Sequence, residues 1–347
     1  MLLEGLHIPL TTPFHQDGRL NLPKLAANMA RYSKSPAAGM IVLGPSGEPT
    51  LLTDNETHEV LRTAAQAAAP EKVLLAGVSC DSVRATLTLA DLSATLLYDV
   101  ILVGAPSILQ PQTNIRELLL YFQSVADRSP LPMVLHSAPA RVLPLDAIVE
   151  LAGHPNILGM LNATDSATEI QTILHHTSAI RHEVLVTPVF SAVTSRMKFA
   201  ASHAPATIVS ANSLSADRPS ATTATSIPPA LRTRTKSVGF QILAGATQSV
   251  LDHLRAGATG AAPSLAACAP QACYEVLAAW KDDDQPLAEQ KQARLCEAAL
   301  LCQAGTGNLK FACELNGYFG GWPRLPQLPP TAHHRDALQL AIHLLRN

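Results

Sequence analysis

Residues 131–164 read LPMVLHSAPARVLPLDAIVELAGHPNILGMLNAT and contain two short apolar runs with a helical pattern between them. Met133–His136 and Asn156–Leu161 have the composition of buried strands. A strand, a helix and a second strand in this order form the βαβ unit of a parallel sheet. Ligands bind at the carboxyl edge of such sheets, so we expect the residues that end these strands to face a site: His136 and Ser137 on the first, and Leu161 and Asn162 on the second.

Apolar runs and helical patterns alternate in the same way along the rest of the chain. Further strands are predicted at residues 6–12, 39–43, 72–78, 100–103, 240–244 and 257–262. Helices are predicted at residues 22–33, after Thr53, and at 81–92, 114–127 and 247–255. Eight strands that alternate with helices, with no glycine-rich dinucleotide fingerprint, predict an α/β fold, a (β/α)8 TIM barrel, over residues 1–263.

Two further regions lie outside this repeat. Helical patterns at 265–280, at 286–303 and in a last segment that ends at Leu345 predict a C-terminal helical subdomain, residues 264–347. An insertion at about residues 177–237 precedes the seventh predicted strand and is much longer than an ordinary connection. Glu183–Ala201 could form a short strand and a helix, whereas Ser210–Lys236 has the composition of a loop or disordered segment. A tolerated surface insertion is the simplest interpretation, and a lid or an oligomer contact is the alternative.

Composition excludes several classes of protein. The chain has 347 residues, 47% of them hydrophobic, and a net charge of -2, which gives no attraction to nucleic acid or to an anionic membrane. The six cysteines contain no C-x-x-C pair, so reduced core thiols are expected in preference to disulfides, and no metal site is expected. The N-terminal sequence has no signal-peptide pattern, and no apolar run reaches the length of a membrane span. A cytoplasmic protein is therefore expected.

The turn Gly44-Pro45-Ser46-Gly47-Glu48 follows the strand predicted at 39–43. Glycines on both sides of a small hydroxyl residue bring backbone N–H groups close to a bound anion such as a carboxylate or phosphate. Such turns are common, so this motif alone is a weak signal.

Together with other stretches, the turn carries a specific resemblance. G-x-x-G-E at Gly44–Glu48, L-T-x-x-E at Leu52–Glu56, VADRSPLPMVLHSAPA at 125–140 and HPNILGM at 154–160 resemble the dihydrodipicolinate synthase/N-acetylneuraminate lyase family, closest to its 4-hydroxy-2-oxoglutarate aldolase branch. The resemblance resumes at Phe240–Gly245 and extends through Asn316–Gly321, leaving out the insertion. It implies a homo-oligomer (dimer or tetramer) and a lyase that forms a Schiff base between a strand-six lysine and pyruvate or another 2-oxo acid. No metal or organic cofactor is implied.

The chain departs from the family pattern at the positions that carry this chemistry. The lysine of G-[IM]-K-[DE] falls at Leu161, in Gly159-Met160-Leu161-Asn162, and leucine has no nucleophile. The strand-five tyrosine falls at His136, and the tyrosine that reaches into the neighbouring subunit's site falls at Ile108. Pro45 replaces the first hydroxyl or its equivalent in the turn, while Ser46 keeps a hydroxyl at the next position. Arg141 matches an arginine that some branches use near the distal carboxylate, and a solvated loop cation is an equally good interpretation.

Two hypotheses of function remain. In the first, the protein is a non-catalytic homologue, a pseudoenzyme that binds a small 2-oxo acid or carboxylate or acts as an inactive subunit with an active paralogue. In the second, it is an active aldolase that works without a Schiff base through His136, paired with Asp165 or Glu48. Lys198 would supply an amine only if the insertion folded over the barrel opening. Either hypothesis predicts one pocket, at the carboxyl ends of the strands, surrounded by Gly44, Ser46, His136, Leu161 and Gly245.

Overall fold

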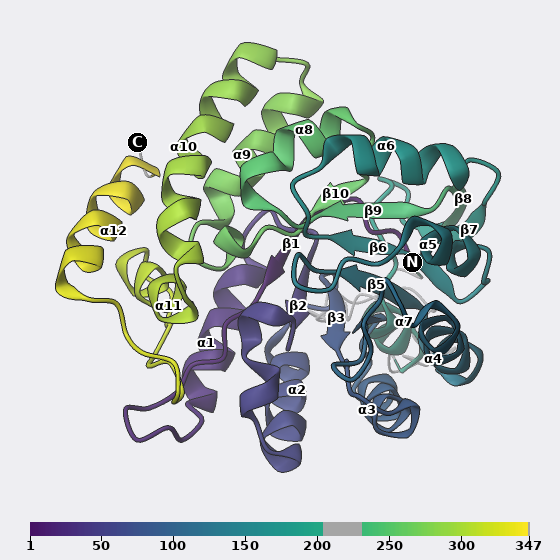
Figure 1. Ribbon diagram of the computed structural model, residues 1–347, viewed down its shortest axis with the longest axis horizontal. Helices are drawn as coiled ribbons and strands as arrows, with labels where there is room; N and C mark the ends of the chain where they lie inside the picture. Colours follow the sequence, from purple (N-terminus) through teal and green to yellow (C-terminus); the bar gives the residue numbers. More distant parts are fainter. Residues whose placement is uncertain (204–230, 346–347) are drawn as a thin grey trace, which may run out of the picture.

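A computed structural model of the protein describes residues 1–203 and 231–345. Eight parallel strands close into a barrel in the order β1-β10-β9-β6-β5-β4-β3-β2, which confirms the predicted TIM barrel (Figure 1). The strands are β1 (Gly5–Pro9), β2 (Gly39–Val42), β3 (Val73–Gly77), β4 (Val100–Gly104), β5 (Met133–Ser137), β6 (Ile157–Asn162), β9 (Gln241–Ala244) and β10 (Gly260–Ala261). The βαβ unit predicted at 131–164 is thus β5, α5 (Leu145–Ala152) and β6, and His136 pairs in register with Leu161.

Several of the helices around the barrel begin after a residue whose side chain caps them. The helices around the barrel are α1 (Leu22–Ser33), α2 (Asp54–Ala67), α3 (Val83–Thr95), α4 (Ile115–Arg128), α5, α6 (Ala167–His176) and α8 (Val250–Arg255). Asn21 caps α1, and Thr53 with Glu56 forms the predicted capping box of α2. The helix predicted to start at Asp81 begins instead at Val83, because Ser82 is its cap and accepts a hydrogen bond from the backbone N–H of Ala85.

The insertion forms its own small sheet, separate from the barrel. β7 (His182–Val186) pairs antiparallel with β8 (Arg234–Val238), and α7 (Ser195–Ser202) lies between them in the sequence. The strand and helix predicted within 183–201 are confirmed. The prediction of a loop as far as Lys236 is wrong at its end, because residues 234–236 belong to β8 and gain ladder hydrogen bonds from β7. The earlier part, residues 210–230, lies outside the described residues.

The described part of the insertion packs against the amino-terminal end of the barrel. The Arg196 guanidinium donates to the backbone carbonyls of Lys72 and Leu97, and the Ser195 backbone N–H donates to the Asp99 carboxylate. These partners immediately precede β3 and β4, so they mark the end opposite the carboxyl-end opening, which we call the mouth. Lys198, on the same helix, therefore lies at the wrong end of the barrel to serve the mouth, and the hypothesis that α7 folds over the mouth is wrong.

The C-terminal region consists of η5 (Ser264–Ala267), α9 (Pro270–Lys281), α10 (Gln285–Gln303), α11 (Thr306–Leu315) and α12 (Ala332–Leu345). In Figure 1, α10, α11 and α12 stand together on one side of the barrel. The single helix predicted at 265–280 is in fact two, η5 and α9. Pro270 has no backbone N–H to donate to the preceding turn, and such a residue is best tolerated at the start of a helix. Within the described residues, no helix is both long and apolar enough to cross a membrane.

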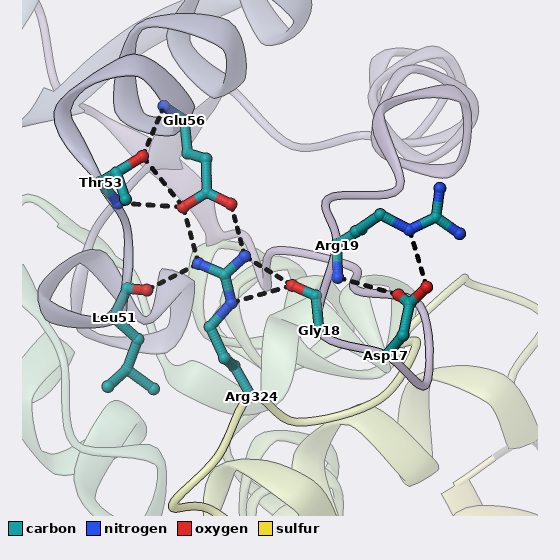
Figure 2. Close-up of polar contacts among 7 residues, drawn as sticks. All are labelled: Asp17, Gly18, Arg19, Leu51, Thr53, Glu56 and Arg324. Atoms are coloured by element: carbon teal, nitrogen blue, oxygen red, sulfur yellow. Dashed lines mark hydrogen bonds and ion pairs between the residues drawn. The ribbon is translucent and has the colours of Figure 1, made fainter.

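Arg324, in the segment between α11 and α12, ties this region to two barrel loops (Figure 2). Its guanidinium donates to both oxygens of the Glu56 carboxylate, at 2.5 and 2.7 Å, and to the carbonyls of Leu51 and Gly18. Glu56 also accepts from the backbone N–H of Thr53, which completes the capping box. A bidentate arginine that uses all its donors holds its partners more firmly than an ordinary surface ion pair.

This contact predicts a loss of stability in acid. The hydrogen bonds from Arg324 lower the pKa of Glu56 to about 2 from its ordinary value of 4.5. A carboxyl whose folded pKa is depressed stabilises the protein above its unfolded pKa, and this stability disappears as the pH falls toward the folded value. Because both side chains are partly solvated, we expect Glu56→Gln to cost about 1 to 2 kcal/mol near neutral pH. In urea unfolding the difference should shrink between about pH 5 and pH 3. The exposed Glu150→Gln is the matched control, and a pH-independent difference would contradict the prediction.

Candidate functional site

A cavity of about 550 Å³ opens at the mouth of the barrel, between the loops that follow β2, β3, β4 and β5. Of the predicted site residues, its lining includes Gly44, Pro45, His136 and Arg141. Ser46, Gly47, Ile108, Leu161 and Gly245 are not among its lining residues. The described residues that line this cavity include no lysine.

His136, near the carboxyl end of β5, lines this cavity. Burial lowers the pKa of its imidazole to about 4, so the ring is neutral near pH 7. Within the described residues, His136 forms no ion pair with either carboxylate considered as its partner, and burial alone accounts for its pKa shift. Glu48 forms an ion pair with Lys310, and Asp165 accepts a hydrogen bond from Ser249 at 3.2 Å. In the part of the chain that the structure describes, the histidine therefore has no carboxylate partner to orient it and raise its basicity.

Leu161 lies beside His136 on the neighbouring strand, β6. Only 4% of the leucine is exposed, and it belongs to an apolar cluster inside the barrel with Val134 and Leu243. Gly245 lies against it, because a Cβ placed on that glycine would come within 3.0 Å of the Leu161 Cδ1 atom. Leu161 and Gly245 thus meet at the carboxyl end of the barrel next to His136, and the leucine side chain fills the space there.

The turn predicted to bind an anion is a short 3-10 helix, Pro45–Gly47. The backbone N–H of Gly47 donates to the carbonyl of Gly44 at 2.8 Å, and Pro45 has no N–H. The Thr12 hydroxyl donates to the carbonyl of Gly47 at 2.6 Å and holds the turn from the loop after β1. Of the backbone N–H groups expected to bind an anion, the one on Gly47 is therefore already used, and position 45 has none.

The structure adds polar groups that the sequence did not single out. The Asp81 carboxylate accepts hydrogen bonds from the Ser107 hydroxyl, at 2.6 Å, and from the Ser107 backbone N–H. These bonds, with a smaller contribution from the charge of Arg141, lower the pKa of Asp81. The Arg141 guanidinium donates to the carbonyl of Ala105 at 3.2 Å. Asp81 lies just beyond the strand predicted at residues 72–78, on the carboxyl side of that strand. This position in the sequence could have marked Asp81 as a candidate site residue.

Ile108, which the family resemblance aligns with a second tyrosine, has its side chain outside the cavity. It is 73% exposed in the loop after β4. All six cysteines are free thiols. Within the described ranges, no group of three or more His, Cys, Asp or Glu side chains is arranged to hold a metal ion.

Fold and site together define a class of protein: a TIM barrel with a cavity at the carboxyl ends of its strands, the end at which proteins of this fold bind their ligands. Residues 2–186, more than half of the chain, match the Dihydrodipicolinate synthetase family, and the chain belongs to that family. The 4-hydroxy-tetrahydrodipicolinate synthase of Acidiphilium cryptum (strain JF-5) is 24% identical over 333 residues, covering 94% of this chain and 93% of that protein. The L-threo-3-deoxy-hexylosonate aldolase of Hypocrea jecorina is 35% identical over 164 residues, covering 45% of this chain and 52% of that protein.

A solved structure supports the fold. YagE, a prophage protein of the dihydrodipicolinic acid synthase family from E. coli K12, crystallised in complex with pyruvate, superposes with a TM-score of 0.76 at 22% identity. The superposition covers 100% of this chain and 99% of that one. The assignment to the 4-hydroxy-2-oxoglutarate aldolase branch stays a prediction.

Proposed function

We propose that this protein binds a small 2-oxo acid or a related carboxylate at the mouth of the barrel and does not form a Schiff base with it. The observation that carries the proposal is Leu161. The residue that falls at the family's lysine position is a buried leucine beside His136, at the carboxyl end of β6. A carbon–carbon lyase of this type needs an amine to convert its substrate into an iminium, and an alkyl side chain has none.

The polar groups of the cavity fit a small anion. Arg141 provides a permanent positive charge, and a guanidinium pairs well with a carboxylate. The neutral imidazole of His136 is able to donate or accept one hydrogen bond to a carbonyl or hydroxyl group. Leu43 and Leu102 supply an apolar wall for the rest of the ligand. The pyruvate complex of YagE, a protein of the same fold, is consistent with a ligand of this size.

An aldolase that uses His136 without a Schiff base is the second candidate. An unprotonated imidazole at a ligand cavity is able to accept a proton, which is the observation that favours it. The low pKa makes it a weak base, however, and neither Glu48 nor Asp165 assists it. We therefore place this function second.

Borohydride reduction in the presence of pyruvate, followed by intact mass measurement, tests the proposal. We expect no covalent adduct, together with reversible pyruvate binding in ligand-observed NMR. Arg141→Ala should weaken that binding about tenfold or more, because one charge-assisted pair is lost. Arg19→Ala, which removes an exposed arginine whose only ion pair within residues 1–203 and 231–345 is with Asp17, should leave pyruvate binding unchanged. An adduct on the unmodified protein would contradict the proposal.

We further propose a homo-oligomer, a dimer or tetramer, located in the cytoplasm. The family resemblance supports the assembly, and the six free cysteine thiols fit a reducing compartment such as the cytoplasm. Light scattering coupled to size-exclusion chromatography would measure the assembly directly, and a monomer at micromolar concentration would contradict it.

A further inference from the structure

Glu48 and Lys310 form an ion pair that is sealed from solvent between the mouth and the C-terminal helices. Their side chains are 1% and 0% exposed. Lys310, on α11, also donates to the carbonyl of Trp322 at 2.9 Å. The other Glu48 oxygen accepts from the backbone N–H of Arg324 at 3.3 Å. Two parts of the C-terminal region, α11 and the segment that follows it, thus contact one carboxylate at the end of the Gly44–Glu48 turn.

The backbone at Glu48 needs such support. Its φ of 55° and ψ of 43° place it in the left-handed region, which residues other than glycine rarely occupy. A strained residue persists where the surrounding structure holds it. Residues on both sides of Glu48, Gly44 and Pro45 before it and Pro49 and Thr50 after it, line the mouth cavity. Glu48 itself is absent from that lining, and its carboxylate binds Lys310 instead. The ion pair therefore contacts one wall of the cavity on the side away from the cavity and holds that wall in place.

Removing both charges from water costs free energy, which sets this ion pair apart from an ordinary contact between the Gly44–Glu48 turn and α11. Burial lowers the pKa of Lys310 to about 8, even though Glu48 opposes that shift. The charges of Cys313 and Arg324 also affect the pKa of Lys310. The centre of the Phe14 ring lies 4.3 Å from the ammonium nitrogen of Lys310. Buried ion pairs often add little net stability, and specifying one geometry is a role for which they are retained.

We propose that the Glu48–Lys310 pair positions the cavity wall formed by residues 44–50, so that the C-terminal helical region sets the affinity of the mouth for its ligand. This inference rests on the proposed function, because it assigns a positioning role at the same carboxylate site. Neither residue lines the cavity, so the pair acts through the backbone between them and the ligand.

The test compares the charge-balanced double variant Glu48→Gln/Lys310→Met with the unmodified protein. Lys291→Met is the matched control, because Lys291 forms an ion pair with Glu275 at 2.7 Å that is remote from the turn. Two quantities are measured: the dissociation constant for pyruvate, by ligand-observed NMR, and amide hydrogen exchange of the segment 44–52. In the double variant, loss of the Glu48–Lys310 ion pair should weaken pyruvate binding about tenfold and speed amide exchange of this segment by a similar factor. The melting temperature and the exchange of β3 should change little in either variant.

The outcomes separate the two proposals. Unchanged pyruvate affinity and unchanged exchange of residues 44–52 in a folded double variant would overturn the positioning role. If pyruvate does not bind the unmodified protein, the proposed function fails, and the exchange of residues 44–52 alone decides the positioning role. A uniform rise in exchange across the barrel would reduce the pair to a general structural role and would also overturn the inference. The single variant Lys310→Met leaves a buried unpaired carboxylate, so it should be less stable than the double variant.

Discussion

Leu161→Lys is expected to form a pyruvate adduct that borohydride traps, a product not expected from the unmodified protein. The new side chain would start from β6 beside His136, next to the mouth cavity. Burial among Val134 and Leu243 would lower the pKa of the amine and favour its neutral, nucleophilic form. Intact mass followed by peptide mapping should place the adduct on residue 161. The control is Leu120→Lys, which adds a lysine at a position 66% exposed on α4 and should give no adduct.

Turnover should not accompany the adduct. The phenols that the family resemblance implies for proton transfer are missing at His136 and Ile108, and lost acid–base assistance commonly costs a factor of about 10² to 10⁴. Adding His136→Tyr and Ile108→Tyr to Leu161→Lys should therefore increase the rate at which 4-hydroxy-2-oxoglutarate is cleaved. The amount of pyruvate released measures this rate. A folded Leu161→Lys variant with no adduct would show that the position does not face the ligand. Efficient cleavage by the unmodified protein would contradict the proposed function.

Gly159→Ala is expected to have the largest effect on stability. Gly159 lies on β6, two residues before Leu161, and pairs with Gln241 on β9. A Cβ at this position would lie 1.9 Å from the backbone carbonyl oxygen of Gln241, a distance that no side-chain adjustment relieves. The two strands would have to separate inside the closed barrel. We expect a loss of about 3 kcal/mol or more in the free energy of unfolding, or failure to obtain soluble protein.

Gly153→Ala provides the matched control for this substitution. Gly153 is the C-cap of α5, has a φ of −70°, and an added Cβ there would meet only the Glu150 carbonyl at 3.4 Å. The free energy of unfolding of the Gly153→Ala variant, measured in urea, should therefore lie within about 0.5 kcal/mol of that of the unmodified protein. Equal stability of the two variants would show that β6 and β9 do not approach as closely as the barrel requires.

Local signals were enough to predict most of the barrel. Buried parallel strands are short apolar runs, and helix starts carry caps such as Asn21 and the Thr53–Glu56 box, so both can be recognised from neighbouring residues. The insertion was also recognised, because its length breaks the repeat. The sequence did not indicate β8, since Arg234–Val238 has little apolar character and becomes a strand through pairing with β7.

The site was predicted in part. His136, Leu161 and Gly245 follow from the ends of three strands, because carboxyl ends of parallel strands meet at one edge. Residues on the loops were less predictable. Ser46 and Ile108 do not line the cavity, while Asp81 and Ser107 do, because a loop's path depends on hydrogen bonds to other loops.

By itself, then, the sequence determined that strands and helices alternate as in a TIM barrel and that a leucine stands at position 161, at the end of a strand, since both follow from contiguous residues. Only the tertiary structure decided that Glu48 pairs with Lys310, 262 positions later, instead of with His136, and that the insertion packs at the end of the barrel opposite the mouth. Such choices depend on which distant groups share a buried volume. An unpaired buried charge is costly, so the carboxylate pairs with the cation that folding buries beside it.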